Sequence, residues 1–171
     1  MPNHDIILLR RVRWLTALFI LGLVISGITA IPLRSEVRWL RAWVDPQPRS
    51  EPPSVMVEWL VKVQHGLNFV GTDFPFLFYG TDWLAFGHFV IAIAFIGALR
   101  DPVRNRWLFD FGLIACVLVI PYVLVFGGVR GIPLWWRMID CSFGIIGAAP
   151  LLLCRKWTKE IELNLEPAKN V

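Results

Sequence analysis

The sequence predicts an all-α integral membrane protein, a four-helix bundle with amphipathic interfacial helices in its first outer loop. The chain has 171 residues, of which 56% are hydrophobic and nine are Trp, a composition that is unusual for a soluble domain of this size. A bilayer core needs about 20 mostly apolar residues per helix, and four segments meet this requirement. These segments are residues 14–31, 83–99, 107–126 and 134–154. We expect residues 1–171 to form a single membrane domain.

The first span, residues 14–31, follows a basic start and has two interpretations. A basic segment before an apolar core is also typical of a cleaved signal peptide. The apolar run is long for a signal peptide, however, and Ile28 fits poorly three residues before a cut after Ala30. We therefore expect a retained transmembrane helix.

The outer loop, residues 32–82, contains two segments with helical apolar spacing. In "RSEVRWLRAWV", the apolar residues Val37, Leu40 and Val44 share one face and arginines occupy another, a pattern that suits a helix in the headgroup region. The proline-rich "DPQPRSEPPS" then ends this helix. A second amphipathic helix follows in "SVMVEWLVKVQHGLNFV", with Ser54 as its expected N-cap. The aromatic "FPFLFYG" is too short to span and is expected in the outer interface.

Basic residues flank the spans, and their positions predict the orientation. They precede the first span, fill the connection between the second and third, and follow the fourth; the residues are Arg10, Arg11, Arg13, Arg100, Arg104, Arg106, Arg155, Lys156 and Lys159. By the positive-inside rule these three regions are cytoplasmic. Both termini, including the tail 155–171, are then on the cytoplasmic side of the membrane. The net charge of +4 is not gathered into a patch with exposed aromatics, so we expect no nucleic-acid partner.

Polar residues inside the predicted spans form the candidate site. At a rise of about 1.5 Å per residue, His88 lies roughly 7 to 8 Å below the outer end of the second helix, taken at Trp83. Asp140 lies at about the same depth in the fourth helix. Other polar or helix-kinking residues near this level are Ser26, Pro121 and Tyr122. Titratable side chains at membrane depth are costly and usually face the bundle interior, so we expect a polar layer in the outer leaflet.

Small residues at helical spacing support this inward orientation. They share a face with each polar residue: Gly144 and Gly147 with Asp140, Ala85 and Ala92 with His88, and Gly22 and Ala30 with Ser26. Small residues at such spacing allow close helix packing in lipid. We therefore expect these three faces to lie at helix contacts.

The strongest chemical hypothesis is a coupled pair of His88 and Asp140. A histidine beside a carboxylate titrates near neutral pH and transfers protons, and Arg137 and Arg130 would supply positive charge to an acidic headgroup or substrate. Asp82 is the third candidate catalytic residue. The candidate cofactor-binding residues are His88, His65, Tyr122 and Arg137.

Each candidate also has a structural interpretation. Asp82 with Thr81 would cap the second helix, and Asp110 would suit the start of the third helix beside Arg106. Asp140 would be held by Arg137 one turn before it, His88 would be a neutral, hydrogen-bonded histidine, and His65 would be solvated. The three cysteines, Cys116, Cys141 and Cys154, lie at different depths, so we expect neither a disulfide nor a metal site.

The runs "YGTDWLAFGHFVIAIAFIGALRDPVRN" and "VRGIPLWWRMIDCSFG" resemble those of a group of small bacterial four-helix inner-membrane proteins. The resemblance covers most of the chain, from Ser26 to the fourth helix. It implies a bacterial inner-membrane location. It implies no catalytic role, because the group has no established activity.

Three functional hypotheses follow. The sequence contains no HExxH, CxxC, Walker or GxSxG motif, which favours a non-enzymatic accessory subunit, or a lipid or ligand binder, in a larger complex or homo-oligomer. The first alternative is a membrane enzyme that acts at the outer leaflet through His88 with Asp140 or Asp82. The second alternative is a redox protein in which His88 contacts a haem or quinone; a bis-histidine haem would need His65 as its second ligand. The identity of any cofactor stays unknown.

Overall fold

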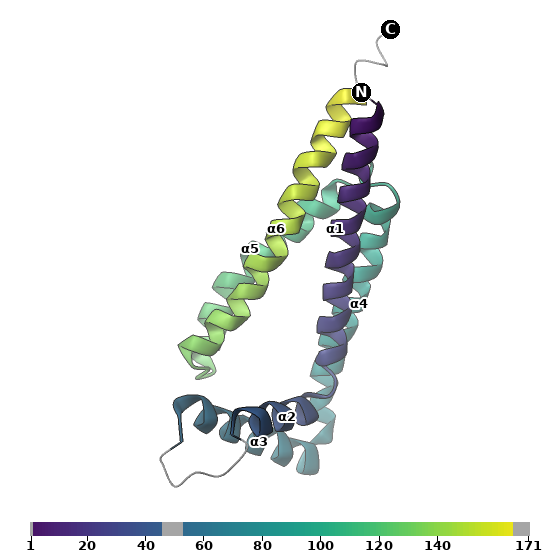
Figure 1. Cartoon of the computed structure of the whole chain (residues 1–171). Coiled ribbons are helices and arrows are strands. Elements are labelled where there is room, and N and C mark those ends of the chain that lie inside the picture. The colour runs from purple at the N-terminus through teal and green to yellow at the C-terminus, as the bar shows by residue number, and fades with distance from the viewer. Residues whose placement is uncertain (1, 46–52, 166–171) are drawn as a thin grey trace. The chain divides into compact units, whose positions relative to one another are not determined.

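The computed structural model describes residues 2–45 and 53–165. These residues are all-α, with six α-helices and one short 3-10 helix (Figure 1). The helices are α1 Pro2–Thr29, α2 Leu33–Val44, α3 Val55–Asp73, η1 Pro75–Phe78, α4 Tyr79–Arg100, α5 Trp107–Val129 and α6 Leu134–Leu165. The predicted all-α class is confirmed. Two predicted segments lie partly outside the described residues. They are the proline-rich segment, at residues 46–52, and the predicted tail, at residues 166–171.

Four helical segments are long and apolar enough to cross a membrane, and they agree with the four predicted spans. They are His4–Thr29, Pro75–Arg100, Trp107–Val129 and Leu134–Leu165. The helices exceed the predicted spans where polar residues continue the helical pattern: α1 begins at Pro2 and α6 runs on to Leu165. At a rise of about 1.5 Å per residue, the 32 residues of α6 are about 48 Å long, which exceeds a bilayer core of about 30 Å.

The chain divides into two compact units. Unit 1 comprises Met1–Gly22 and Ala92–Val171, and unit 2 comprises Leu23–Ile91. The boundary falls within α1 and within α4. The single domain expected from the sequence stays a prediction.

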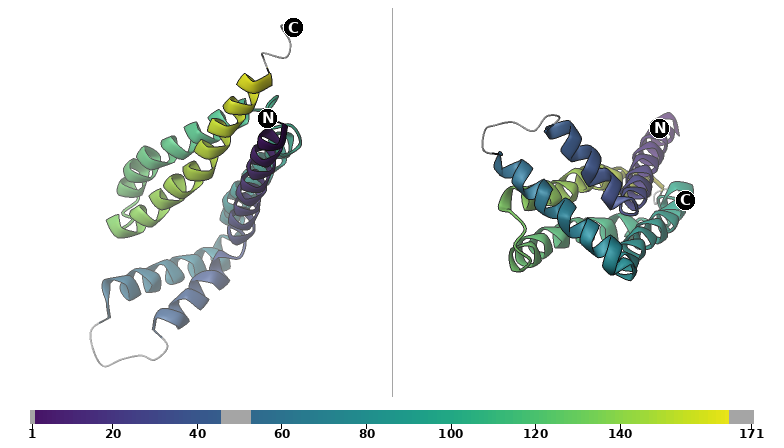
Figure 2. Two further views of the ribbon diagram at one scale, coloured as in Figure 1. Left: turned by 45° about the horizontal axis from the view of Figure 1, so that its top comes forward. Right: turned by 90° about the horizontal axis from the view of Figure 1, so that it is seen from below.

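In unit 1, α5 and α6 form an antiparallel hairpin (Figure 2). Gly131 has a φ of 69°, a left-handed conformation that glycine adopts without the cost of a side chain, and this turn reverses the chain. The backbone N–H of Ile132 donates to the carbonyl of Gly127 at 2.8 Å, which closes the end of α5. Gly144 of α6 packs so closely on α5 that a Cβ atom there would lie 2.6 Å from the carbonyl oxygen of Cys116.

All four long helices contribute to the interior of unit 1. Phe95 of α4 is completely buried, and its ring centroid lies 4.8 Å from that of Phe19 in α1 and 6.5 Å from that of Phe109 in α5. Where α1 meets α6, the buried Thr16 hydroxyl donates to the carbonyl of Val12 at 2.8 Å and lies 3.9 Å from the sulfur of Cys154. The buried hydroxyl is thus satisfied within its own helix, so this contact needs no water.

In unit 2, α2 packs beside α3 (Figure 2). Ser54 caps α3 as predicted, since its hydroxyl accepts a hydrogen bond from the N–H of Val57 at 3.4 Å. The arginine-bearing face of α2 contacts α3, because the Arg41 guanidinium donates to the side chain of Gln64 at 2.7 Å. Arg34 likewise lies against Gly71, where a Cβ would come within 2.6 Å of its guanidinium.

The end of α1 packs on the start of α4, also within unit 2. Gly27 is the contact residue, because a Cβ there would lie 3.1 Å from the carbonyl oxygen of Ala85 and 2.6 Å from the ring of Phe89. The prediction that Ser26 marks the packed face of the first helix is therefore wrong. Ser26 is exposed, because the neighbouring glycine, which has no side chain, permits the closer approach.

Candidate functional site

Charged side chains from three segments lie at one end of unit 1, which we name the charged end. The segments are residues 4–13 of α1, residues 100–110, which include the α4–α5 connection and the first turn of α5, and residues 155–164 of α6. Near the start of α1, His4 lies 3.0 Å from Glu160 of α6, and Asp5 accepts a hydrogen bond from Asn164 at 2.8 Å. The start of α1 and the end of α6 therefore lie side by side (Figure 1).

The α4–α5 connection joins the same end through two ion pairs. Arg106 pairs with Glu162, and Asp110 in the first turn of α5 pairs with Arg155. Arg13 of α1 donates to the carbonyl of Arg100 at 3.2 Å. The prediction that Asp110 lies in the first turn of its helix is confirmed, but Arg106, its expected partner, pairs with α6 instead.

The charged end carries an excess of positive charge. Among the described residues, two ion pairs join charged side chains, Arg106 with Glu162 and Arg155 with Asp110, and His4 contacts Glu160. The other basic side chains of the charged end have no ion-pair partner within residues 2–45 and 53–165; they are Arg10, Arg11, Arg13, Arg100, Arg104, Lys156 and Lys159.

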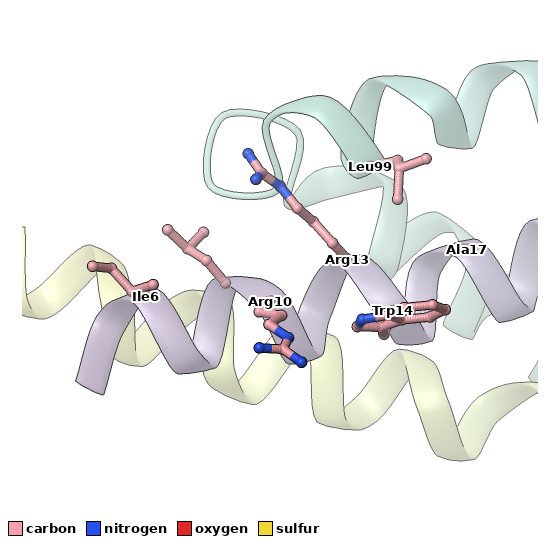
Figure 3. Close-up of a pocket in the computed structure, with 7 residues that line it drawn as sticks. Ile6, Arg10, Arg13, Trp14, Ala17 and Leu99 are labelled. Atoms are coloured by element: carbon pink, nitrogen blue, oxygen red, sulfur yellow. The ribbon is translucent and has the colours of Figure 1, made fainter. Parts of the chain in front are cut away.

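Two shallow grooves flank α1 at the charged end. The first, which we name the α1–α4 groove, has a volume of about 600 Å³ and is lined by Ile6, Leu9, Arg10, Arg13, Trp14, Ala17 and Leu99 (Figure 3). The second, of about 520 Å³, runs between α1 and α6, where Arg11 and Trp157 join Arg10 and Trp14. Each groove combines an apolar floor with at least two arginines. Neither lining includes an acidic residue.

His88, the centre of the predicted polar layer, makes a hydrogen bond within its own helix. Its Nδ1 lies 2.8 Å from the carbonyl oxygen of Leu84, and the ring is partly exposed. The neighbouring Ala85 and Ala92 are buried, with 1% and 4% of their surfaces exposed, so the small residues of this face do lie at helix contacts. His88 belongs to unit 2 and Asp140 to unit 1, so the coupled pair stays a prediction.

Asp140 and Arg137 do not form the local ion pair considered from the sequence. The guanidinium of Arg137 is turned toward α5, where it donates to the carbonyl of Leu124 at 3.0 Å. Gly127 and Gly128 leave room for the arginine stem against the end of α5, where the helix dipole favours a cation. Within the described residues no ion pair joins Asp140 to a basic side chain.

The remaining candidates are Asp82 and His65 in unit 2 and Tyr122 in unit 1. Asp82 does not cap its helix, because α4 begins at Tyr79 and places Asp82 within the first turn, while the Thr81 hydroxyl donates to the carbonyl of Phe78. His65 is exposed on α3. Tyr122 is 62% exposed and stacks on Phe126 of its own helix. The roles of these residues in binding a cofactor stay predictions.

Metal-binding residues do not cluster in the described part of the chain. Residues 2–45 and 53–165 contain no group of three or more His, Cys, Asp or Glu side chains placed to hold a metal ion. The three cysteines are free, and Cys141 and Cys154 are buried.

Comparison with known proteins adds no relative: no known family, curated protein or solved structure matches the chain. Functional inference therefore rests on the geometry of the two units.

The sequence reasoning missed the two grooves, although part of the signal was present. Arg10, Arg13 and Ala17 follow at the three- and four-residue spacing that places side chains on one helix face. The opposite wall of the α1–α4 groove is Leu99 of α4, and no local pattern indicates that contact.

Proposed function

We propose that the chain is a small integral protein of a bacterial inner membrane, a four-helix bundle that acts as a non-enzymatic accessory subunit or as a lipid-binding component. The four long apolar helices support the membrane placement. Large apolar side chains also remain exposed along these helices, among them Leu18, Ile93, Val117 and Ile145. Lipid chains would cover these side chains at no cost in hydration.

The observation that supports the proposal most is the charged end of unit 1. The sequence assigns three separate basic regions to the cytoplasm, and the contacts of His4 with Glu160, Arg13 with Arg100 and Arg155 with Asp110 bring these regions to one end. A bundle with all three regions on one side satisfies the positive-inside rule without conflict. In this orientation both termini are cytoplasmic, and the last turns of α6 extend past the lipid core.

The segment from α3 to α4 would then face the outer leaflet. Its aromatic side chains Phe76, Tyr79 and Trp83 are each more than half exposed, and exposed aromatic rings are typical of the membrane–water interface. Trp39 and Trp43 of α2 are exposed as well. In this proposal α2 and α3 are the interfacial helices of the outer loop.

Carbonate washing of isolated membranes, followed by native mass spectrometry after mild detergent extraction, tests the proposal. We expect the protein to stay in the washed membranes and to emerge with a partner polypeptide, a second copy or phospholipids. Release by carbonate would contradict the membrane placement. A stoichiometric organic cofactor or a Soret absorption band that is lost in His88→Ala would overturn the non-enzymatic role in favour of redox chemistry.

A further inference from the structure

We propose that the α1–α4 groove binds one anionic phospholipid of the cytoplasmic leaflet, with its headgroup between Arg10 and Arg13 and an acyl chain along Trp14, Ala17 and Leu99. This inference rests on the proposed membrane placement and names a ligand for the charged end. The groove lies wholly within unit 1.

The apolar part of the groove suits a hydrocarbon chain. Trp14 is 70% exposed and forms one side of the groove (Figure 3). Ala17 lies one turn further into the predicted span and leaves space on the face of α1 that points to Leu99. Tryptophan at the level of the headgroups presents an apolar ring and a polar N–H, which matches the region where a lipid headgroup meets its chains.

The basic part of the groove suits a phosphate. Arg10 and Arg13 are exposed and have no ion-pair partner among the described residues. One nitrogen of Arg13 is held by the carbonyl of Arg100 at 3.2 Å, which fixes the side chain and leaves further N–H groups available. Arginine binds phosphate through two parallel N–H donors, and a side chain that is already held loses less entropy on binding.

Charge complementarity selects an anionic lipid over a zwitterionic one. The groove contains two arginines and no acidic side chain, so the positive charge of a choline headgroup would meet two like charges and no carboxylate there. The adjoining α1–α6 groove adds Arg11, whose guanidinium lies 5.8 Å from the ring centroid of Trp157. Basic pockets between transmembrane helices on the cytoplasmic side are known to bind anionic headgroups.

Competitive lipid binding measured by native mass spectrometry tests the proposal. The full chain in a neutral detergent receives equal amounts of phosphatidylglycerol and phosphatidylcholine with identical acyl chains. We expect the wild type to retain phosphatidylglycerol about fivefold or more over phosphatidylcholine, and each of Arg10→Gln and Arg13→Gln to lower that preference about fivefold. Arg104→Gln is the matched control, because Arg104 is exposed at the charged end but lies outside both grooves.

Further variants and probes separate the alternatives. Ala17→Trp fills the groove without changing its charge, so it should reduce retention of phosphatidylglycerol even if the arginine variants fold poorly. Equal retention of the two lipids by the wild type, or an equal loss in Arg104→Gln, would overturn the site. Displacement of the lipid by inorganic phosphate at the same concentration would also overturn it, because the headgroup alone would then be the ligand. A protein that resists carbonate washing but shows no lipid preference refutes this site alone, whereas release by carbonate refutes the proposed function.

Discussion

Gly144→Ala should separate the α5–α6 hairpin and destabilise the protein. The added Cβ would lie 2.6 Å from the carbonyl oxygen of Cys116 and 2.7 Å from a methyl carbon of Val119. Ordinary van der Waals contacts begin near 3.4 Å, so the two helices would have to move apart by several tenths of an ångström. The carbonyl belongs to the backbone of α5 and has no rotamer by which to avoid the clash.

The expected cost combines two opposing terms. Overpacking of a tight interface typically costs about 1–3 kcal/mol, with values toward the upper end where backbone must move. Replacement of glycine by alanine inside a helix returns up to about 1 kcal/mol through helix propensity. The net destabilisation is therefore about 1–2 kcal/mol, or a decrease of about 5 °C in Tm for a chain of this size.

A fluorogenic maleimide measures this effect with the native cysteines. Cys141 and Cys154 are buried and react only when the bundle opens on heating. Gly87→Ala is the matched control, since Gly87 lies inside a long apolar helix and a Cβ there meets nothing within 4 Å; its Tm should stay unchanged or rise. Gly147→Ala should fall between the two, because its nearest contact is 3.2 Å to a side-chain sulfur. A Gly144→Ala protein as stable as the Gly87→Ala protein would refute the close contact of α5 and α6.

Substitutions at three further positions are measured by the same assay. Gly127→Ala should cost about 1–2 kcal/mol, because its Cβ would lie 2.5 Å from the Cδ of Arg137, whose guanidinium is held on α5; an unchanged Tm would contradict this contact. Phe95→Ala should cost about 1–3 kcal/mol, because it leaves a cavity, although the apolar bilayer removes much of the free energy that a buried side chain gains by leaving water. Phe95→Leu should cost clearly less stability. Asp110→Asn should cost under about 1 kcal/mol, because its ion pair with Arg155 is half exposed; high salt should shrink that difference, and a loss as large as that of Phe95→Ala would disprove the estimate.

Helix type and approximate length followed from the sequence because apolar runs and flanking charges are local patterns. Ser54 was identified as a cap for the same reason. The first span begins later than α1 and the fourth span ends earlier than α6, because the sequence criterion measures hydropathy, whereas the helices continue through polar residues that contact each other, such as Asp5 with Asn164.

The contacts of the candidate residues were harder to predict, because each charged side chain has several possible hydrogen-bond or ion-pair partners. Arg137 is one turn from Asp140, but the two glycines at the end of α5 offer a closer fit and a carbonyl acceptor. Asp110 likewise lies beside Arg106 in sequence, yet its partner is Arg155 of α6. Spacing along one helix identifies neighbours on that helix, and it does not identify which residue of another helix competes for the same charge.

The orientation of the charged end tests the account most directly. Two single-cysteine variants, Lys159→Cys near the end of α6 and Arg130→Cys at the α5–α6 turn, are made in a chain whose three native cysteines are replaced by alanine. Intact spheroplasts are then treated with a membrane-impermeant maleimide. We predict labelling of Arg130→Cys in intact spheroplasts and labelling of Lys159→Cys only after lysis. Labelling of both sites before lysis, or of Lys159→Cys alone, would contradict a membrane protein whose basic end is cytoplasmic.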